Sequence, residues 1–236
     1  MNLTDSLDII RYSDGETEEV SDLMVNEASL SIHVNGEIVK ELLCSPAELE
    51  ELALGYLVTQ GYISDKADVL DFEVDDKAFV ANITLKDEIS DGKFGLNLEQ
   101  NESIVFKKGT LLHNLVQFYG ESTLQKATAG VHRCALCDDS GIIYSSDDIS
   151  RHCAFDKIIG HAVTEGITLS DKYVITSGRV PLDMIKKVNV CGIPMIVSRT
   201  APTISAANFA RDRDITLLGF ARENRFNIYS GFSRII

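Results

Sequence analysis

The chain has little positive charge, no long apolar run and no basic, apolar leader. Lysines and arginines number 22 against 36 aspartates and glutamates, which leaves a formal net charge of −14 over 236 residues. This balance argues against nonspecific binding to nucleic acid or to an anionic membrane. No apolar run approaches the roughly 20 residues that a membrane span needs, and the opening MNLTDSLDIIRYSDGETEEV is polar and acidic. We therefore expect a soluble cytoplasmic protein with neither nucleic acid nor membrane as a partner.

Common nucleotide and metal motifs are also missing. The sequence has neither a Walker A nor a GxGxxG pattern, which argues against a standard ATP or NAD site. Its five cysteines are an odd number in a chain with no export signal, so reduced thiols are the default. Cys134 and Cys137 have CxxC spacing, but no second pair accompanies them, so a zinc site or a zinc deaminase is the minority hypothesis. We expect no metal site.

The first third of the chain predicts strands, hairpins and one helix. Residues 1–25 are acid-rich and are expected to be poorly ordered or to form an edge strand. Alternating apolar residues on both sides of Asn35 and Gly36 predict a β-hairpin, and residues 71–85 predict another. The acidic stretch from 86 to 101 predicts a loop.

Two helix starts carry capping signals. Ser45 is the expected N-cap of the first helix, with Pro46 at the first helical position and Glu48 completing a capping box. Gly61 is expected to end that helix. Thr110 is expected to cap a second helix.

The rest of the chain alternates between strands and helices. GVHRCALC and IIYSS, joined by DDSG, predict a hairpin, and a helix follows it. Strand, helix, strand, helix, strand then come in short units, which implies parallel pairing with right-handed crossovers. The expected fold is α/β (α+β overall), with an N-terminal hairpin and helix region at 1–108 and a C-terminal α/β domain at 109–236.

Four arginines follow the three strands of that alternating region: Arg179, Arg199, Arg222 and Arg225. Loops at the carboxyl ends of parallel strands meet at one edge of the sheet, where open α/β sheets bind ligands. Guanidiniums gathered there in an acidic chain are candidates for binding an anion, most simply phosphate. The alternative is that these arginines pair with carboxylates on the surface.

Two groups of chemically active residues lie outside those loops. His152 and Asp156 are four residues apart on the predicted helix, so the carboxylate could orient the imidazole, although an ordinary surface ion pair fits the spacing equally well. In a regular strand, His132 and Cys134 share one face and Cys137 takes the other. Cys134 is then the more credible nucleophile, since an imidazole can favour its thiolate. Buried structural thiols are the alternative.

Several long motifs resemble one family. EELALGYLVTQGYI, GVHRCALCDDSG, DDISRHCAFDKIIG and the C-terminal TSGRV, GIPMIVSRTAPT and ITLLGFAR resemble the formate dehydrogenase accessory sulfurtransferase family, FdhD. The resemblance runs from about Ser29 to the C-terminus. It implies a cytidine-deaminase-like, three-layer C-terminal domain and a homodimer. It also implies that persulfide sulfur passes from a cysteine desulfurase to the molybdenum (or tungsten) bis-guanine-dinucleotide cofactor of formate dehydrogenase.

The resemblance also implies which residues hold that cofactor. The loop Phe220, Ala221, Arg222, Glu223, Asn224 and Arg225 would cradle a guanine dinucleotide, in agreement with the arginine edge that includes Arg179 and Arg199. His132, Arg151, His152 and Asp156 match polar positions of the family and would line the same cavity.

The sequence departs from the family in its cysteines. Many members carry a CxxC upstream of the histidine motif, whereas residues 87–108 contain no cysteine. Either sulfur transfer has moved to Cys134 or Cys137, or the chain is a chaperone that binds the cofactor without transferring sulfur. Cys153 is a third candidate.

Overall fold

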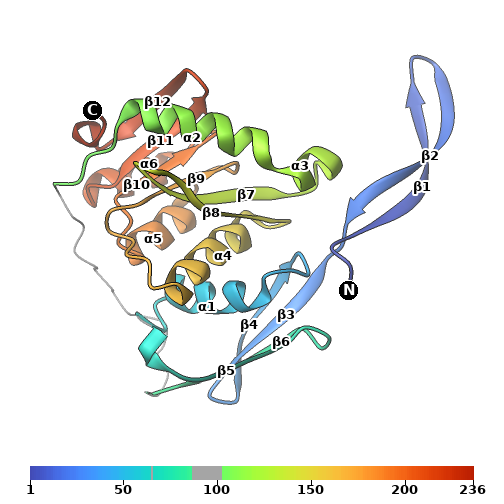
Figure 1. Cartoon of the computed structure of the whole chain (residues 1–236), viewed down its shortest axis with the longest axis horizontal. Coiled ribbons are helices and arrows are strands. Elements are labelled where there is room, and N and C mark those ends of the chain that lie inside the picture. Colours follow the sequence, from blue (N-terminus) through green and yellow to red (C-terminus); the bar gives the residue numbers. More distant parts are fainter. Residues whose placement is uncertain (65, 87–102) are drawn as a thin grey trace.

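The N-terminal residues form a hairpin that projects from the rest of the molecule (Figure 1). The structure is a computed structural model that describes residues 1–64, 66–86 and 103–236. Strands β1 (Thr4–Ser13) and β2 (Glu16–Val25) pair antiparallel along their whole length. Asp14 and Gly15 make the turn with φ of 53° and 92°. The sequence predicted that these residues are either poorly ordered or an edge strand. The structure shows a pair of strands.

Four strands make a second sheet, in the order β4-β3-β6-β5. Both hairpins predicted from the sequence are confirmed. The expected turn at Asn35 and Gly36 has φ of 51° and 87°, as a tight turn between twisted strands requires. The predicted loop from 86 to 101 lies, apart from Lys86, outside the described residues. The strands are β3 (Ala28–Val34), β4 (Glu37–Cys44), β5 (Val69–Asp75) and β6 (Val80–Leu85).

The first helix, α1 (Leu49–Thr59), begins later than predicted, and its capping prediction is wrong. Pro46 precedes the helix instead of opening it. The Ser45 hydroxyl accepts a hydrogen bond from the backbone of Ile149 at 3.1 Å, and the Ser45 backbone donates to Asp148 at 3.1 Å. The hydroxyl and backbone N–H of Ser45 therefore bond to residues about a hundred positions away, and the hydroxyl does not cap the helix.

Glu48 also binds residues that are distant in the sequence and does not form a capping box. It precedes α1 with φ of 53°, and its carboxylate accepts hydrogen bonds from the hydroxyls of Tyr144 and Ser146. The predicted end of the helix is right, since Gly61 follows it with φ of 78°.

Helix α1 packs backbone to backbone against α4 (Arg151–Thr164), which lies under the large sheet (Figure 1). A Cβ added at Gly55 would lie 1.7 Å from the carbonyl oxygen of Asp156, and one at Gly160 would lie 1.9 Å from that of Glu51. One apolar cluster runs from strands β3 and β6 through both helices into the large sheet. The domain boundary at 108 stays a prediction.

The largest sheet has six strands in the order β12-β11-β10-β9-β7-β8. Strands β9, β10 and β11 are parallel, as predicted, and helices α5 (Leu182–Val190) and α6 (Ile204–Asp212) connect them. One apolar cluster joins the sheet to α4, α5 and α6, and another joins its opposite face to α2 (Lys108–Glu121), so helices cover both faces. The strands are β7 (His132–Asp138), β8 (Gly141–Asp148), β9 (Tyr173–Thr176), β10 (Met195–Ser198), β11 (Thr216–Arg222) and β12 (Arg225–Ser230).

The second predicted helix cap is also wrong. Helix α2 begins with Lys107 as its N-cap, and Thr110 lies inside the helix. None of the helices in the described ranges is long and apolar enough to cross a membrane. The remaining helices are α2 (Lys108–Glu121), α3 (Thr123–Thr128), α5 (Leu182–Val190) and α6 (Ile204–Asp212), with short 3₁₀ turns η1 (Lys66–Asp68) and η2 (Phe232–Arg234).

Candidate functional site

The three loops after the parallel strands form one hydrogen-bonded edge. The Ser198 hydroxyl at the end of β10 donates to the carbonyl of Gly178 at 2.7 Å. The backbone N–H of Arg199 donates to the carbonyl of Thr176 at 3.1 Å, and that of Phe220 donates to the carbonyl of Thr200 at 3.1 Å. The structure thus brings the loops together as the parallel topology predicted.

Arg199 and Arg222 meet over one hollow of this edge. The Arg199 guanidinium lies 4.7 Å from the ring centroid of Tyr119, and Arg222 donates to the carbonyls of Arg199 and Ala221 at 2.5 and 2.8 Å. In the described part of the chain, neither arginine forms an ion pair with a carboxylate. This disfavours the surface-pairing alternative for both. The hollow has a volume of about 240 Å³ and is lined by Tyr119, Arg199, Arg222, Glu223 and Asn224.

The other two predicted arginines, Arg179 and Arg225, lie outside the hollow. Arg179 and Arg225 are exposed, and neither lines that hollow. Their loops belong to the same edge, because Arg179 follows β9 and Arg225 begins β12 next to β11. The structure therefore brings together two of the four guanidiniums and leaves two at the rim.

Phe220 has a strained backbone at the start of the predicted cofactor loop. Its φ is 50°, a left-handed conformation that bulky residues rarely adopt, and its side chain is 43% exposed. At the preceding Gly219, an added Cβ would lie 2.9 Å from the Pro202 ring and 2.8 Å from Tyr229, so the backbone packs closely against both side chains. Backbone strain of this kind is common in functional loops.

His132 and Arg151 lie at the same edge, beside Gly178. Strand β7 runs antiparallel to β9, so its first residue, His132, lies near the loop that follows β9. A Cβ added at Gly178 would lie 3.1 Å from Arg151 and 3.5 Å from Nδ1 of His132. Burial, and then the charge of Arg151, lowers the pKa of His132, so its imidazole is neutral at pH 7. The Arg151 Nε is buried without a hydrogen-bond partner among the described residues.

The predicted pairing of His152 with Asp156 is wrong. His152 Nε2 lies 3.3 Å from the carboxylate of Asp183 on α5. Both Asp156 oxygens accept from the Lys187 ammonium, at 2.7 and 2.6 Å, and one also accepts from the Thr59 hydroxyl at 2.8 Å. Asp156 is only 1% exposed, so the surface-pair alternative is wrong too. Helix α5 therefore supplies the partner of His152, and helices α1 and α5 together supply the partners of Asp156.

Lys187 is the residue that sequence reasoning missed. It lies on the apolar face of α5 with Met184 and Val188, and all three are buried. A lysine on the apolar face of an amphipathic helix requires a buried partner, so its position was a usable signal.

A larger cavity lies where α4 and α5 meet the N-terminal part of the chain. It has a volume of about 630 Å³ and shares no lining residue with the arginine hollow. Of the polar residues that the resemblance put in one cavity, His152 and Asp156 line this larger pocket, whereas His132 and Arg151 line neither of the two. The ionisable residues and thiols lining the larger one are Glu27, Lys40, Glu41, Tyr56, His152, Cys153, Asp156, Asp183 and Lys187.

Cys134 and Cys137 lie on opposite faces of β7, as strand alternation predicted. Cys134 belongs to the apolar cluster under α4, and Cys137 belongs to the one under α2. Burial raises the pKa of the Cys134 thiol to about 12, against a weaker opposing effect of its hydrogen bond to Thr176 at 3.4 Å. Burial raises the pKa of Cys137 as well. Neutral pH therefore favours the thiol at both residues, and their role as sulfur carriers stays a prediction.

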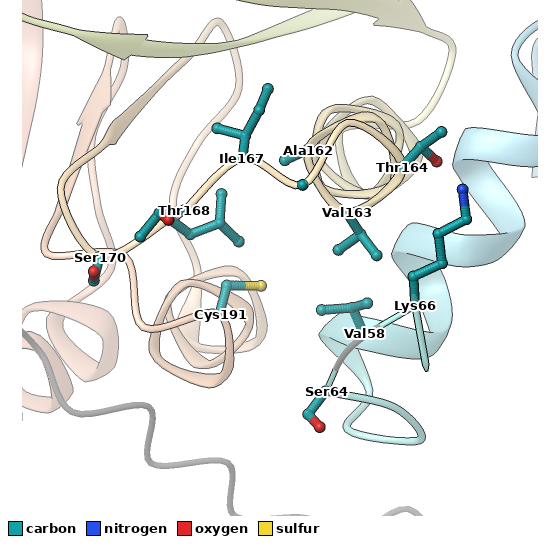
Figure 2. Close-up of a pocket in the computed structure, with 12 residues that line it drawn as sticks. Val58, Ser64, Lys66, Ala162, Val163, Thr164, Ile167, Thr168, Ser170 and Cys191 are labelled. Atoms are coloured by element: carbon teal, nitrogen blue, oxygen red, sulfur yellow. The ribbon is translucent and has the colours of Figure 1, made fainter. Parts of the chain in front are cut away.

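The other cysteines are also free and buried, but two of them line pockets. Cys153 lines the larger cavity just described. Cys191 lines a separate pocket of about 510 Å³, where its side chain lies near Val58 and Thr168 (Figure 2). Of the five cysteines, Cys153 is thus the one that shares a described pocket with a cluster of ionisable side chains.

The fold and the edge define an α/β protein whose strand-end loops gather arginines that pair with no carboxylate among the described residues, a layout typical of proteins that bind anionic ligands. The profile of the FdhD/NarQ family matches residues 25–236. The chain therefore belongs to the FdhD/NarQ family, as its motifs indicated.

Relatives and a solved structure agree with this assignment. The chain is 33% identical over 251 aligned positions to the "Sulfur carrier protein FdhD" of Staphylococcus aureus strain MRSA252, covering 97% of this chain and 95% of the relative. The corresponding protein of strain JH9 is 32% identical with the same coverage. A crystal structure of a putative formate dehydrogenase accessory protein from Desulfotalea psychrophila matches with a TM-score of 0.88 over the whole of both chains, at 23% identity. This last likeness concerns the fold.

Proposed function

We propose that this chain is a sulfurtransferase that takes persulfide sulfur from a cysteine desulfurase and passes it to the molybdenum (or tungsten) bis-guanine-dinucleotide cofactor of a formate dehydrogenase. The family assignment and the names of the relatives, sulfur carrier protein and formate dehydrogenase accessory protein, support this role. The cofactor is cargo that the protein receives and releases, and the protein's task is to hold it while sulfur is transferred.

The arginine edge is the observation that carries the proposal. A guanine dinucleotide presents phosphates, and Arg199 and Arg222 offer guanidinium donors that no described carboxylate neutralises. Tyr119 stiffens this arrangement, because its hydroxyl donates to the carbonyl of Ala221 at 3.0 Å and its ring lies under Arg199. The neighbouring Arg151 and His132 extend the polar surface along the same strand ends.

Sulfur transfer requires a cysteine that becomes a persulfide. The sequence assigns this role to Cys134, with His132 tuning the thiol and Cys137 assisting. Because burial opposes thiolate formation at both cysteines, these assignments require the strand to open before reaction. Sulfur that loads from a desulfurase and cysteine onto wild type, but not onto the Cys134→Ala/Cys137→Ala double variant, would support them.

Guanosine diphosphate binding tests the cofactor edge. Arg222→Ala is expected to weaken binding about tenfold or more, since a charge-assisted hydrogen bond contributes roughly 1.5–3 kcal/mol. Arg213→Ala is the matched control, because Arg213 lies over Phe209 on α6, away from the three loops. Calorimetric titration of both variants measures the effect.

Equal affinities of wild type and Arg222→Ala would contradict the proposed site. A protein that binds the nucleotide and supports formate dehydrogenase maturation, yet gains no sulfur on any cysteine, would be the non-catalytic chaperone instead.

The other expectations belong to the same proposal. Parallel strands β9, β10 and β11 with helices on both faces support a cytidine-deaminase-like, three-layer C-terminal domain. We also propose a cytoplasmic homodimer, which sedimentation of the purified protein would measure.

A further inference from the structure

The cavity of about 630 Å³ contains a thiol that the proposed function has not used. Cys153 lies in the first turn of α4, where its backbone N–H donates to the capping Ser150 hydroxyl. Its Sγ points toward the chain end of β4 and donates to the carbonyl of Leu43 at 3.6 Å. Leu43 and Cys153 therefore form part of one wall of the cavity.

A second thiol lies beside the first. Cys44 follows Leu43 at the end of β4. The negative charge of its thiolate form raises the pKa of the Cys153 thiol. Cys44 itself does not line the cavity. The fold thus places two cysteines 109 positions apart in the chain next to one another, with one of them at the cavity wall.

The same cavity holds a histidine suited to take a proton. His152 Nε2 is held at 3.3 Å from Asp183, which fixes the ring and leaves its other nitrogen for a second partner. Burial, and then the charge of Lys187, lowers the pKa of His152, so the imidazole is neutral at pH 7 and can act as a base. A cysteine and a carboxylate-oriented histidine together are the parts of an activated nucleophile.

We infer that Cys153 is the residue of this chain that accepts sulfane sulfur, with a persulfide donor entering the cavity and His152 receiving the thiol proton. This inference rests on the proposed function, keeps its sulfur transfer and replaces Cys134 by Cys153 as the acceptor. The Cys153 thiolate attacks the terminal sulfur of the donor persulfide, so that a new S–S bond forms while the S–S bond of the donor breaks. The donor leaves as a thiolate and takes the proton from His152, and neither an oxidant nor a reductant is consumed.

The three cysteines that line no described pocket are less suited to this step. Cys44, Cys134 and Cys137 are 0% exposed and line none of the described pockets, whereas Cys153, itself only 2% exposed, lies in the wall of the larger cavity. Cys191 lines the pocket of Figure 2, whose described lining is mostly apolar and hydroxyl-bearing and contains no histidine. Among the described pockets, a thiol and a histidine line the same cavity at Cys153.

Persulfide mapping on the full chain tests the assignment. Wild type, Cys153→Ser, Cys44→Ser and Cys191→Ser are incubated with glutathione persulfide, trapped by alkylation and mapped by peptide mass spectrometry. The peptide with Cys153 is expected to gain one sulfur atom in wild type and in both control variants, and the gain is expected to be lost in Cys153→Ser. Thermal unfolding and guanosine diphosphate binding of Cys153→Ser confirm that it is folded.

The pH dependence gives a second readout. Burial, then the charge of Asp148 on β8, raises the pKa of Cys153 to about 12, with Asp156 and Cys44 adding to it and the Ser150 hydrogen bond opposing it. The thiolate fraction therefore rises about tenfold per pH unit between about pH 7 and 9, and loading is expected to accelerate with it. His152→Gln is expected to slow loading more at the lower pH, where hydroxide cannot replace the base.

Sulfur that loads equally onto Cys153→Ser, or that maps to Cys134 or Cys137 in wild type, would overturn the inference and leave the proposed function standing. Failure of every cysteine to take sulfur, even from a desulfurase and cysteine, would overturn both. A His152→Gln profile parallel to wild type would remove histidine from the step.

Discussion

At the scale of single residues, the pair of Asp156 and Lys187 shows that a buried charged side chain requires an oppositely charged partner. Lys187 is 8% exposed and Asp156 1%, and the ammonium contacts both carboxylate oxygens. Neither group could be buried without the other, because an unpaired charge in an apolar interior is unfavourable by several kcal/mol. This pair links α4 to α5 and forms part of the wall beside Cys153.

Removing one partner is therefore expected to destabilise the protein strongly. Lys187→Met should lower the free energy of unfolding by about 3–5 kcal/mol, because it leaves the Asp156 carboxylate buried and unpaired. Lys186→Met, on the exposed side of the same helix, is the matched control and should change little. Urea unfolding monitored by circular dichroism measures both. The double variant Asp156→Asn/Lys187→Met should regain part of the loss, and no recovery would argue against the pair as the cause.

At the scale of elements, the crossing of α1 and α4 depends on two glycines. The backbones touch at Gly55 and Gly160, where a Cβ would lie within 2 Å of a carbonyl oxygen of the other helix. This approach places the first turn of α4, with Arg151 and Cys153, between the sheet edge and the N-terminal strands. The glycines thus position the candidate site although they carry no side chain of their own.

Alanine at either glycine is expected to push the helices apart. Gly55→Ala should lower the free energy of unfolding by about 1–3 kcal/mol or more, the usual effect of overpacking a core. Gly109→Ala in α2 is the control, because open space surrounds it, and there the substitution should raise stability by up to about 1 kcal/mol. Thermal unfolding distinguishes the two. Equal stability of Gly55→Ala and wild type would contradict the backbone contact.

At the scale of the whole molecule, the hairpin of β1 and β2 is an appendage. It exposes Leu7, Ile10 and Tyr12 and projects from the body (Figure 1). A two-stranded hairpin in isolation is marginally stable in water, and neither apolar core cluster of the described chain includes its residues. The body therefore owes little of its stability to it.

Deleting residues 1–25 is expected to leave the rest folded. Because a change of 1 kcal/mol shifts the Tm of a protein this size by about 2–4 °C, the truncated chain should melt within about 4 °C of the full chain. Calorimetry of both measures the difference, and guanosine diphosphate affinity serves as the control for the site. A much larger drop in Tm would show that the hairpin contributes to the core.

Sequence patterns predicted most elements but not the contacts between distant ones. Alternation and turn residues placed the hairpins at Gly36 and before Gly141, and the short strand–helix units predicted the parallel sheet and its arginine edge. The capping box at Ser45 and Glu48 failed because Ile149, just after strand β8, donates to the Ser45 hydroxyl and Ser146 of β8 donates to Glu48. His152 and Asp156 were matched by spacing, whereas α5 offered each a nearer partner.

By itself, the sequence determined the family, the order of the elements and the split of Cys134 from Cys137 across β7, because motifs and periodicities act along a single chain. The tertiary structure alone decided which groups meet. It buried residues 133–137 of GVHRCALC in the sheet, paired Asp156 with Lys187, and brought Cys153 from α4 to the end of β4 at the wall of a cavity. Burial and proximity control thiol reactivity, and both arise only when distant segments pack together.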